Sequence, residues 1–343
     1  MKALHDVLES MRLPNGTYIA SPSQDYSYVW IRDVCYAVLP YLTSNCDRYQ
    51  KTYHALLDLF LRYEWKIDIH TKKKPVLPYE YIHARYSKDL MELTVPWGHA
   101  QNDSIGLFLW GTGVGIRQGK PMIRSDADRR ILQKLVDYLA CLEYWQEPDN
   151  GMWEETVEIH SSSVGACVAG LKSINMLVDI PAHLIEKGEA ALRQLLPRES
   201  FSKQTDLALL SLIYPFGVVS RNMAQRILED VTSTLERKFG CIRYLGDRYY
   251  NGGREAEWCF GFPWLGLCYS MLGEDRKAHE YWEKTISILP EDGTIPELYI
   301  GGTDRPNGNK PLAWAVAMAI LLQERIEQSA TVGKNREKMY DKI

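Results

Sequence analysis

The sequence predicts an all-α fold, an (α/α)6 barrel of six helical hairpins, in a single domain that covers residues 1–330. Apolar residues recur at three- and four-residue spacing along most of the chain, which is typical of helices, and no strand alternation of useful length interrupts them. Amphipathic segments also alternate with segments that are apolar over most of their surface, as expected for an outer and an inner ring. A polar tail is expected at residues 331–343.

About twelve helices are expected from this spacing. They lie near residues 2–12, 31–43, 47–66, 97–116, 126–145, 160–178, 182–196, 203–213, 220–238, 257–272, 274–289 and 310–327. The segment 47–66 shows the outer pattern, with Tyr53, Leu57 and Phe60 on one stripe and Asp58 away from it. The segment 160–178 is instead apolar or small almost all round, so we expect it in the inner ring.

Five long connections interrupt the helices, at residues 13–30, 67–96, 146–158, 239–256 and 290–311. Each is polar and contains Pro or Gly. In a closed helical ring, loops of this kind at one end build the functional site. No repeat at a fixed period favours a solenoid instead, and no linker divides the chain before its polar end.

Composition excludes several classes of partner. Forty basic and 44 acidic residues leave a net charge of −4, so no positive field attracts nucleic acid. The longest apolar run, 312–322, is shorter than the roughly 20 residues that a membrane-spanning helix needs. No secretion signal is evident, and seven cysteines without metal-binding spacing indicate free thiols in the cytoplasm. No cofactor is expected, because no glycine-rich loop matches a nucleotide-binding motif. No metal is expected, because no residues stand at metal-ligand spacing.

The long connections carry aromatic rings beside charged and amide side chains. The segments are 26–33 (YSYVWIRD), 97–103 (WGHAQND), 150–155 (NGMWEE), 243–247 (RYLGD) and 296–299 (PELY). Planar rings stack on the apolar faces of sugars, while carboxylates, amides and guanidinium groups bind hydroxyls. The alternatives are rings packed at half-exposed helix contacts, an exposed acidic loop at Glu154–Glu155, and a simple ion pair at Arg32–Asp33.

Cleavage of a glycosidic bond needs two carboxyl groups with opposed protonation states. Glu154 and Glu155 are adjacent, so repulsion together with burial near Trp153 would leave one of them protonated near neutral pH. The second carboxylate must face the sugar from the other side, and Glu297 in a distant loop is the natural candidate. Only a closed ring brings these residues together.

The chain resembles the glucoamylase family of inverting α-glucosidases, glycoside hydrolase family 15, in five segments that occur in the family order. They are YSYVWIRD at 26–33, WGHAQND at 97–103, GMWEE at 151–155, RYLGDRYYNG at 243–252, and GTIPELY at 293–299 with PLAWAVA at 311–317. The resemblance implies an (α/α)6 barrel that releases glucose from the non-reducing ends of α-glucosides. It also implies a general acid at Glu154, a general base at Glu297 and a hydroxyl-binding residue at Glu155. The other implied sugar-binding residues are Arg32 and Asp33 at the terminal glucose, Trp97 stacking on it, Arg243 at the adjoining sugar, and Tyr26, Trp30, Trp153 and Trp314 lining the pocket.

Two further expectations follow from this resemblance. Inversion requires the carboxyl groups of Glu154 and Glu297 to lie roughly 6.5 to 9.5 Å apart, with room for a water molecule. The connections are shorter than in larger relatives, so small α-gluco-oligosaccharides are the expected substrates. His99 is expected to be a hydrogen-bonded wall residue, because no second ligand stands at metal-binding spacing.

Two other functions stay open. The stretch IHARYS at 82–87, followed by WGHAQND, resembles the regulatory subunits of phosphorylase kinase more than typical glucoamylases, which would make the chain a sugar-sensing barrel without turnover. The presence of both Glu154 and Glu297 argues against this, since a binding module has no use for a general base opposite a general acid. A trehalase or α-1,6-glucosidase would differ only in how the leaving sugar is held.

Overall fold

The computed structural model describes residues 2–340 and contains a closed inner ring of helices. Going round the ring, each inner helix contacts the next, and the last contacts the first. Its members in chain order are α2 (Ile31–Val38), α6 (Asn102–Arg117), α8 (Ser161–Ile174), the 3₁₀ helix η2 (Leu207–Leu212), α11 (Gly261–Met271) and α13 (Ala313–Tyr340). The predicted (α/α)6 barrel is therefore confirmed.

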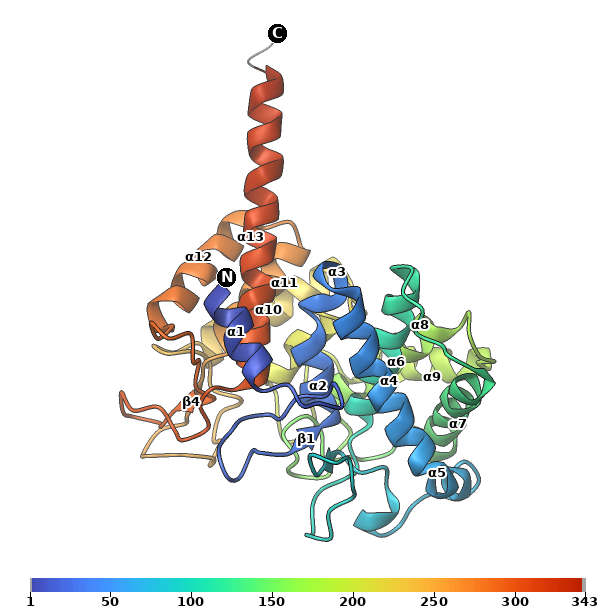
Figure 1. The fold of residues 1–343 in the computed structure, drawn as a ribbon. Coiled ribbons are helices and arrows are strands. Elements are labelled where there is room, and N and C mark those ends of the chain that lie inside the picture. Colours follow the sequence, from blue (N-terminus) through green and yellow to red (C-terminus); the bar gives the residue numbers. More distant parts are fainter. Residues whose placement is uncertain (1, 341–343) are drawn as a thin grey trace.

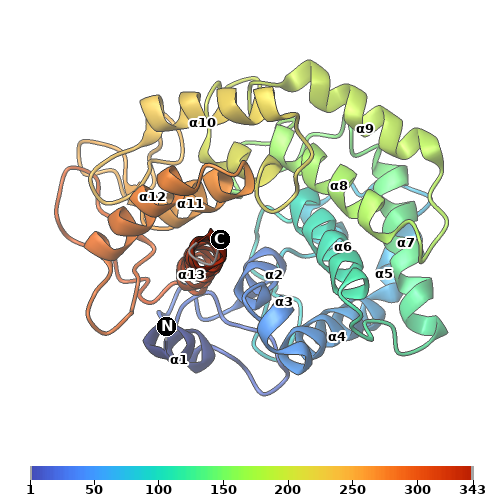
Figure 2. The ribbon, with the colours of Figure 1, turned by 90° about the horizontal axis from the view of Figure 1, so that it is seen from above.

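An outer helix precedes each inner one along the chain, and Figure 2 shows the outer helices surrounding the inner ring. The outer helices are α1 (Lys2–Ser10), α4 (Cys46–Arg62), α7 (Asp126–Leu142), α9 (Ala182–Leu195), α10 (Arg221–Leu235) and α12 (Asp275–Ile288). Two short helices, α3 (Tyr41–Ser44) and α5 (Glu64–His70), follow α2 and α4 directly, and a 3₁₀ turn, η1 (Pro78–Glu80), lies in the connection to α6.

Small residues allow the inner helices α6 and α8 to pack backbone to backbone. A Cβ atom on Gly106 would lie 2.4 Å from the carbonyl carbon of Ala166, and one on Gly170 would lie 2.5 Å from the carbonyl oxygen of Gly106. Distances this short are incompatible with a side chain, so glycine is required at both positions. The nearly uniform small and apolar character of 160–178 thus reflects burial inside the ring.

Two short antiparallel pairs of strands lie at the end of the barrel where the inner helices begin (Figure 1). Strand β1 (Val29–Trp30) pairs with β2 (Arg85–Tyr86), and β3 (Glu257–Trp258) pairs with β4 (Leu298–Tyr299). Each pair ties one long connection to a second one. The sequence did not predict these strands, because two residues are too few to show an alternating pattern.

The expected helices are found, with local differences. The segments 31–43 and 47–66 each form two helices, 203–213 is a 3₁₀ helix over its central part only, and 97–101 and 257–260 precede their helices rather than belonging to them. Helix α13 continues to Tyr340 and projects from the barrel (Figure 1), so the backbone of 331–340 is helical, while 341–343 lie outside the described residues. The domain boundary at residue 330 stays a prediction.

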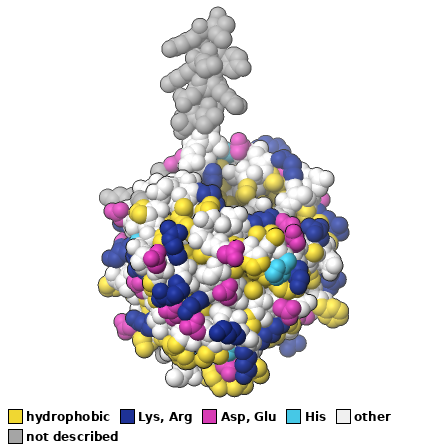
Figure 3. Space-filling model, turned by 90° about the vertical axis from the view of Figure 1, so that its right-hand side faces the viewer, with side chains coloured by type: hydrophobic (Ala, Val, Ile, Leu, Met, Phe, Trp, Pro, Cys, Tyr) yellow, Lys and Arg dark blue, Asp and Glu magenta, His cyan; other side chains and the backbone are white. Residues whose placement is uncertain are grey.

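The surface and the thiols agree with the sequence analysis where the structure describes them. Figure 3 shows acidic and basic side chains interspersed over the face it presents, without a broad basic area. Cys35, Cys167, Cys241, Cys259 and Cys268 are buried free thiols, and Cys141 is partly exposed. Between residues 2 and 340, no helix is both long and apolar enough to cross a bilayer.

Candidate active site

A cavity opens at the end of the barrel where the inner helices begin, with about 550 Å³ of empty space including its mouth. Its lining consists of Tyr26, Trp30, Arg32, Asp33, Trp97, Met152, Trp153, Glu154, Arg243, Trp258, Phe260, Glu297, Leu312 and Trp314. Ten of the eleven residues that the sequence analysis selected are in this set, and Glu155 is the exception.

Glu154 reaches the cavity from a tight turn before α8. Its φ angle is +62°, in the left-handed region that costs a non-glycine residue on the order of 1–3 kcal/mol. Its carboxylate accepts hydrogen bonds from Arg32 Nη2 at 3.2 Å and from Trp97 Nε1 at 2.8 Å. The strained turn thus presents this carboxylate to helix α2 and to the loop before α6.

Asp149 holds the turn in place. Its carboxylate accepts hydrogen bonds from the backbone N–H of Asn102 at 2.9 Å and of Gly151 at 3.1 Å, and it bonds to His160 Nδ1 at 3.0 Å. Burial lowers the pKa of His160, but the bond to Asp149 more than offsets this and raises it to about 9. The ion pair with His160 therefore fastens the loop that carries Glu154 to the start of α8, and the hydrogen bond from Asn102 fastens it to the start of α6.

Arg32 and Asp33 begin α2 on the floor of the site. The Arg32 guanidinium donates from Nη1 to Asp103 at 2.9 Å and to Gln101 at 3.1 Å, in addition to its bond with Glu154. Burial raises the pKa of Asp33 to about 7; Arg32 opposes the shift, and the charges of Glu154 and Glu297 add to it. Asp33 is thus within electrostatic reach of both candidate catalytic carboxylates.

Glu155 points away from Glu154 and lies beside the cavity. It accepts hydrogen bonds from Arg243 Nη2 at 2.6 Å and from the Tyr244 hydroxyl at 2.5 Å, and Lys203 Nζ lies 3.4 Å away. Each of the two adjacent glutamates therefore faces a cation of its own, which offsets the repulsion expected from their adjacency. Arg243 is in turn fixed by two 2.7 Å hydrogen bonds to Asp247.

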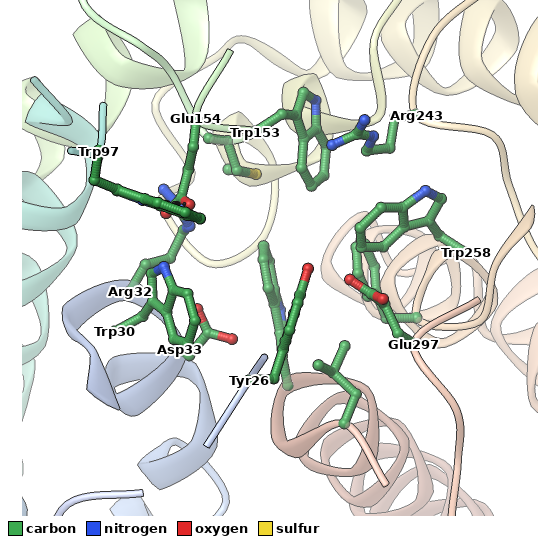
Figure 4. A pocket seen from close by; sticks show the side chains of 14 residues that line it. Tyr26, Trp30, Arg32, Asp33, Trp97, Trp153, Glu154, Arg243, Trp258 and Glu297 are labelled. Carbon is green, nitrogen blue, oxygen red and sulfur yellow. Dashed lines mark hydrogen bonds and ion pairs between the residues drawn. The ribbon is translucent and has the colours of Figure 1, made fainter. Parts of the chain in front are cut away.

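Glu297 lies in the connection before α13, on the side of the cavity opposite Glu154 (Figure 4). Its Oε2 accepts hydrogen bonds from Asn307 Nδ2 at 2.5 Å and Asn309 Nδ2 at 2.7 Å, whereas Oε1 accepts no well-formed hydrogen bond from the described residues. Burial raises the pKa of Glu297, and hydrogen bonds from Asn309, Tyr26 and Asn307 partly offset that rise.

Stacked rings form one wall of the cavity. Phe260 stacks on Trp314 with ring centres 4.7 Å apart, and Trp153 lies nearly parallel to both. Trp153 Nε1 donates to Asp206 at 2.8 Å, which fixes the plane of its indole. The wall is therefore rigid and flat, as a sugar-stacking surface needs to be.

Sequence reasoning missed four lining residues: Met152, Trp258, Phe260 and Leu312. Trp258 and Phe260 immediately precede α11, as Trp30 precedes α2, and the sequence analysis placed them inside a helix instead. The position of Trp30 directly before α2 is the signal that could have pointed to Phe260 at the same position before α11. Leu312 and Met152 carry no comparable signal.

His99 contacts the site only indirectly. Its Nδ1 accepts a hydrogen bond from the backbone N–H of Ala84 at 3.3 Å, and its ring stacks on His83 with centres 3.7 Å apart. Burial lowers the pKa of His99 to about 4 and that of His83 to about 3. His99 is hydrogen-bonded as expected, although it does not line the cavity. Among residues 2–340, no three His, Cys, Asp or Glu side chains gather in a metal-binding group.

The family model "Glycosyl hydrolases family 15" matches residues 2–289. The chain belongs to glycosyl hydrolase family 15. Solved structures of this fold include one titled "Glycosidase Wild Type", with a TM-score of 0.82, 21% identity and 95% of both chains covered. A glucoamylase from Saccharomycopsis fibuligera gives a TM-score of 0.69 at 14% identity, covering 95% of this chain and 93% of that one.

Curated relatives of this family-15 chain carry a different name. It is 28% identical to a probable phosphorylase b kinase regulatory subunit alpha of Caenorhabditis elegans, which matches 79% of this chain and 27% of that protein. It is 26% identical to the liver isoform of the same subunit in Mus musculus, which matches 89% of this chain and 31% of that protein. The chain thus spans about three tenths of the length of these relatives.

Proposed function

We propose that this protein is an inverting, exo-acting α-glucosidase that releases β-glucose from the non-reducing ends of small α-gluco-oligosaccharides. The observation that carries the proposal is the position of Glu154 and Glu297 on opposite sides of one cavity whose wall is a stack of aromatic rings. Two facing carboxyl groups are the arrangement that hydrolysis with inversion needs.

In the proposed mechanism, Glu154 donates its proton to the glycosidic oxygen as the bond from that oxygen to C1 breaks. Glu297 removes a proton from a water molecule, whose oxygen bonds to C1 from the opposite face. We assign that proton to Oε1 of Glu297, because Oε2 is held by two asparagines. One water is consumed, and the products are β-glucose and a shortened chain.

The other residues bind the sugar. Arg32 and Asp33 hold hydroxyls of the terminal glucose, and the Trp97 ring stacks on that sugar. Tyr26, Trp30, Trp153 and Trp314 line the pocket around it. Arg243 and Glu155 bind hydroxyls of the adjoining sugar, which leaves with the proton from Glu154. The mode of binding at this last pair decides between an α-1,4-glucosidase, an α-1,6-glucosidase and a trehalase.

A second candidate function is a sugar-sensing barrel without turnover, since the curated relatives named above are regulatory subunits of phosphorylase b kinase. The two functions differ in what the carboxyl groups do. A sensor needs hydroxyl-binding groups only, whereas hydrolysis needs a proton donor and a proton acceptor on opposite sides of the bond.

The test is to incubate the purified protein with maltose, isomaltose, trehalose and maltotetraose and to measure released glucose. Glu154→Gln and Glu297→Gln are each expected to lose roughly 10²- to 10⁴-fold in kcat, because each removes a general acid or base, while glucose binding by calorimetry persists. Wild-type rates in either variant would contradict the assigned roles. Sugar binding with no glucose released from any substrate would favour the sensor.

A further inference from the structure

Arg85 lies on strand β2, and its guanidinium group stacks against the ring of Trp97, although Arg85 does not line the cavity. Its central carbon is 3.6 Å from the centre of the Trp97 ring, and the rings of Tyr28 and Trp30 lie 5.0 and 5.3 Å away. Arg85 is 6% exposed, and its Nε is buried without a hydrogen bond among the described residues. A buried cation stacked on rings in this way has no surface role.

Strand pairing fixes the position of Arg85. Its backbone pairs with that of Trp30. The neighbouring residue, Ala84, accepts a hydrogen bond from Ile31 N at its carbonyl at 3.0 Å and donates one from its N–H to His99 at 3.3 Å. Strand β2 therefore joins the loop before α2 to the loop before α6. Arg85 stands where these two loops meet, so its plane is set by rigid surroundings.

Trp97 connects Arg85 to Glu154, the candidate general acid. Trp97 Nε1 donates to Glu154 Oε2 at 2.8 Å, so the tilt of the indole determines where that oxygen lies. Arg85 covers the indole ring and restricts this tilt. A guanidinium plane suits this task better than an ammonium group, because it can stack over the whole ring.

We infer that Arg85 is a positioning residue for the proton donor Glu154 and acts through Trp97. This inference rests on the proposed hydrolytic function. Its consequence is specific to one half of the reaction: loss of Arg85 impairs protonation of the leaving group and leaves the attack by water assisted by Glu297 intact. A misplacement of a catalytic group by an ångström costs up to about 100-fold in rate.

The experiment compares two substrates that differ in their need for an acid. The sugar leaving group of maltose needs a proton from the enzyme, whereas the fluoride of α-glucosyl fluoride departs without one. For Arg85→Leu we expect kcat on the best disaccharide to fall about 10- to 100-fold, with kcat on the fluoride within about twofold of wild type. Trp97→Phe keeps a ring but loses the N–H, and adding Arg85→Leu to it should cause little further loss, because both act on one contact.

Two further variants keep the inference testable. Arg62→Leu removes a guanidinium that binds the carbonyls of Asp89 and Leu90 in the same connection and lies outside the cavity lining, so it should lower thermal stability without separating the two substrates. Arg85→Lys replaces Arg85→Leu if the latter does not fold, with the same selective loss expected. Equal losses on both substrates, a change in KM alone, or no change would overturn the inference. A wild type that hydrolyses neither substrate would instead overturn the proposed function.

Discussion

The hydrogen bonds that Asn309 and Asn307 donate to Glu297 should set the acid limb of the pH profile. A general base must be deprotonated, so kcat/KM falls as the pH drops through the pKa of Glu297 in the free enzyme. Burial raises that pKa above its ordinary value of 4.5, and hydrogen bonds from Asn309, Tyr26 and Asn307 hold it down. Removing one of them should therefore raise the pKa further and move the acid limb to higher pH.

The structure gives the size of the shift for Asn309→Ala. The lost bond is 2.7 Å long and charge-assisted, a class that contributes about 1.5–3 kcal/mol. Asn307 still bonds to the same oxygen, so we take the lower end of this range, which corresponds to about one pH unit. The backbone carbonyl of Asn309, which accepts from Glu297 N at 2.9 Å, is retained in the variant.

The assay is kcat/KM for the best disaccharide measured from pH 3 to pH 9 in steps, for wild type and variant. Asn15→Ala is a matched control, because Asn15 bonds to Lys88 and Thr17 and lies outside the cavity lining, so its acid limb should stay in place. An acid limb of Asn309→Ala that stays put or moves to lower pH would refute the assignment of Glu297 as the base.

Two other predictions concern residues around the site. Lys203→Met removes the cation 3.4 Å from Glu155, so we expect KM for disaccharides to rise several-fold with kcat little changed in steady-state kinetics; an unchanged KM would contradict the role of Glu155 at the adjoining sugar. His83→Phe should shift acid unfolding, followed by circular dichroism, to lower pH. Burial depresses the pKa of His83 from 6.5 to about 3, so the folded state binds fewer protons than the unfolded chain over that window and loses stability as the pH falls; an unchanged midpoint would argue against it.

Much of the fold was accessible from the sequence, because helices in two rings leave different patterns. The outer segment 47–66 and the inner segment 160–178 were distinguishable by one apolar stripe against uniform apolarity. The residues at which helices begin were harder to predict. Trp97 and Ala100 are three residues apart, as on a helix, but α6 begins only at Asn102, whose backbone N–H is bound by Asp149 from a distant loop.

Residues of the candidate site could be predicted from the sequence where a short segment combines aromatic rings with charged side chains, as at Arg32 and Trp153. Residues whose role depends on a contact between distant segments could not be predicted in this way. Asp206 fixes the Trp153 indole from 53 positions away, and Arg85 covers Trp97 from another connection. No spacing rule indicates either contact, because only closure of the ring creates it.

The anomeric form of the first glucose released tests the central claim most directly. Proton NMR within the first minutes of hydrolysis of the best disaccharide separates α- from β-glucose before the two interconvert. A donor at Glu154 and a base at Glu297 on opposite sides of the sugar predict β-glucose first, with the α-form appearing only later. α-Glucose as the first product would contradict this arrangement of the two carboxyl groups.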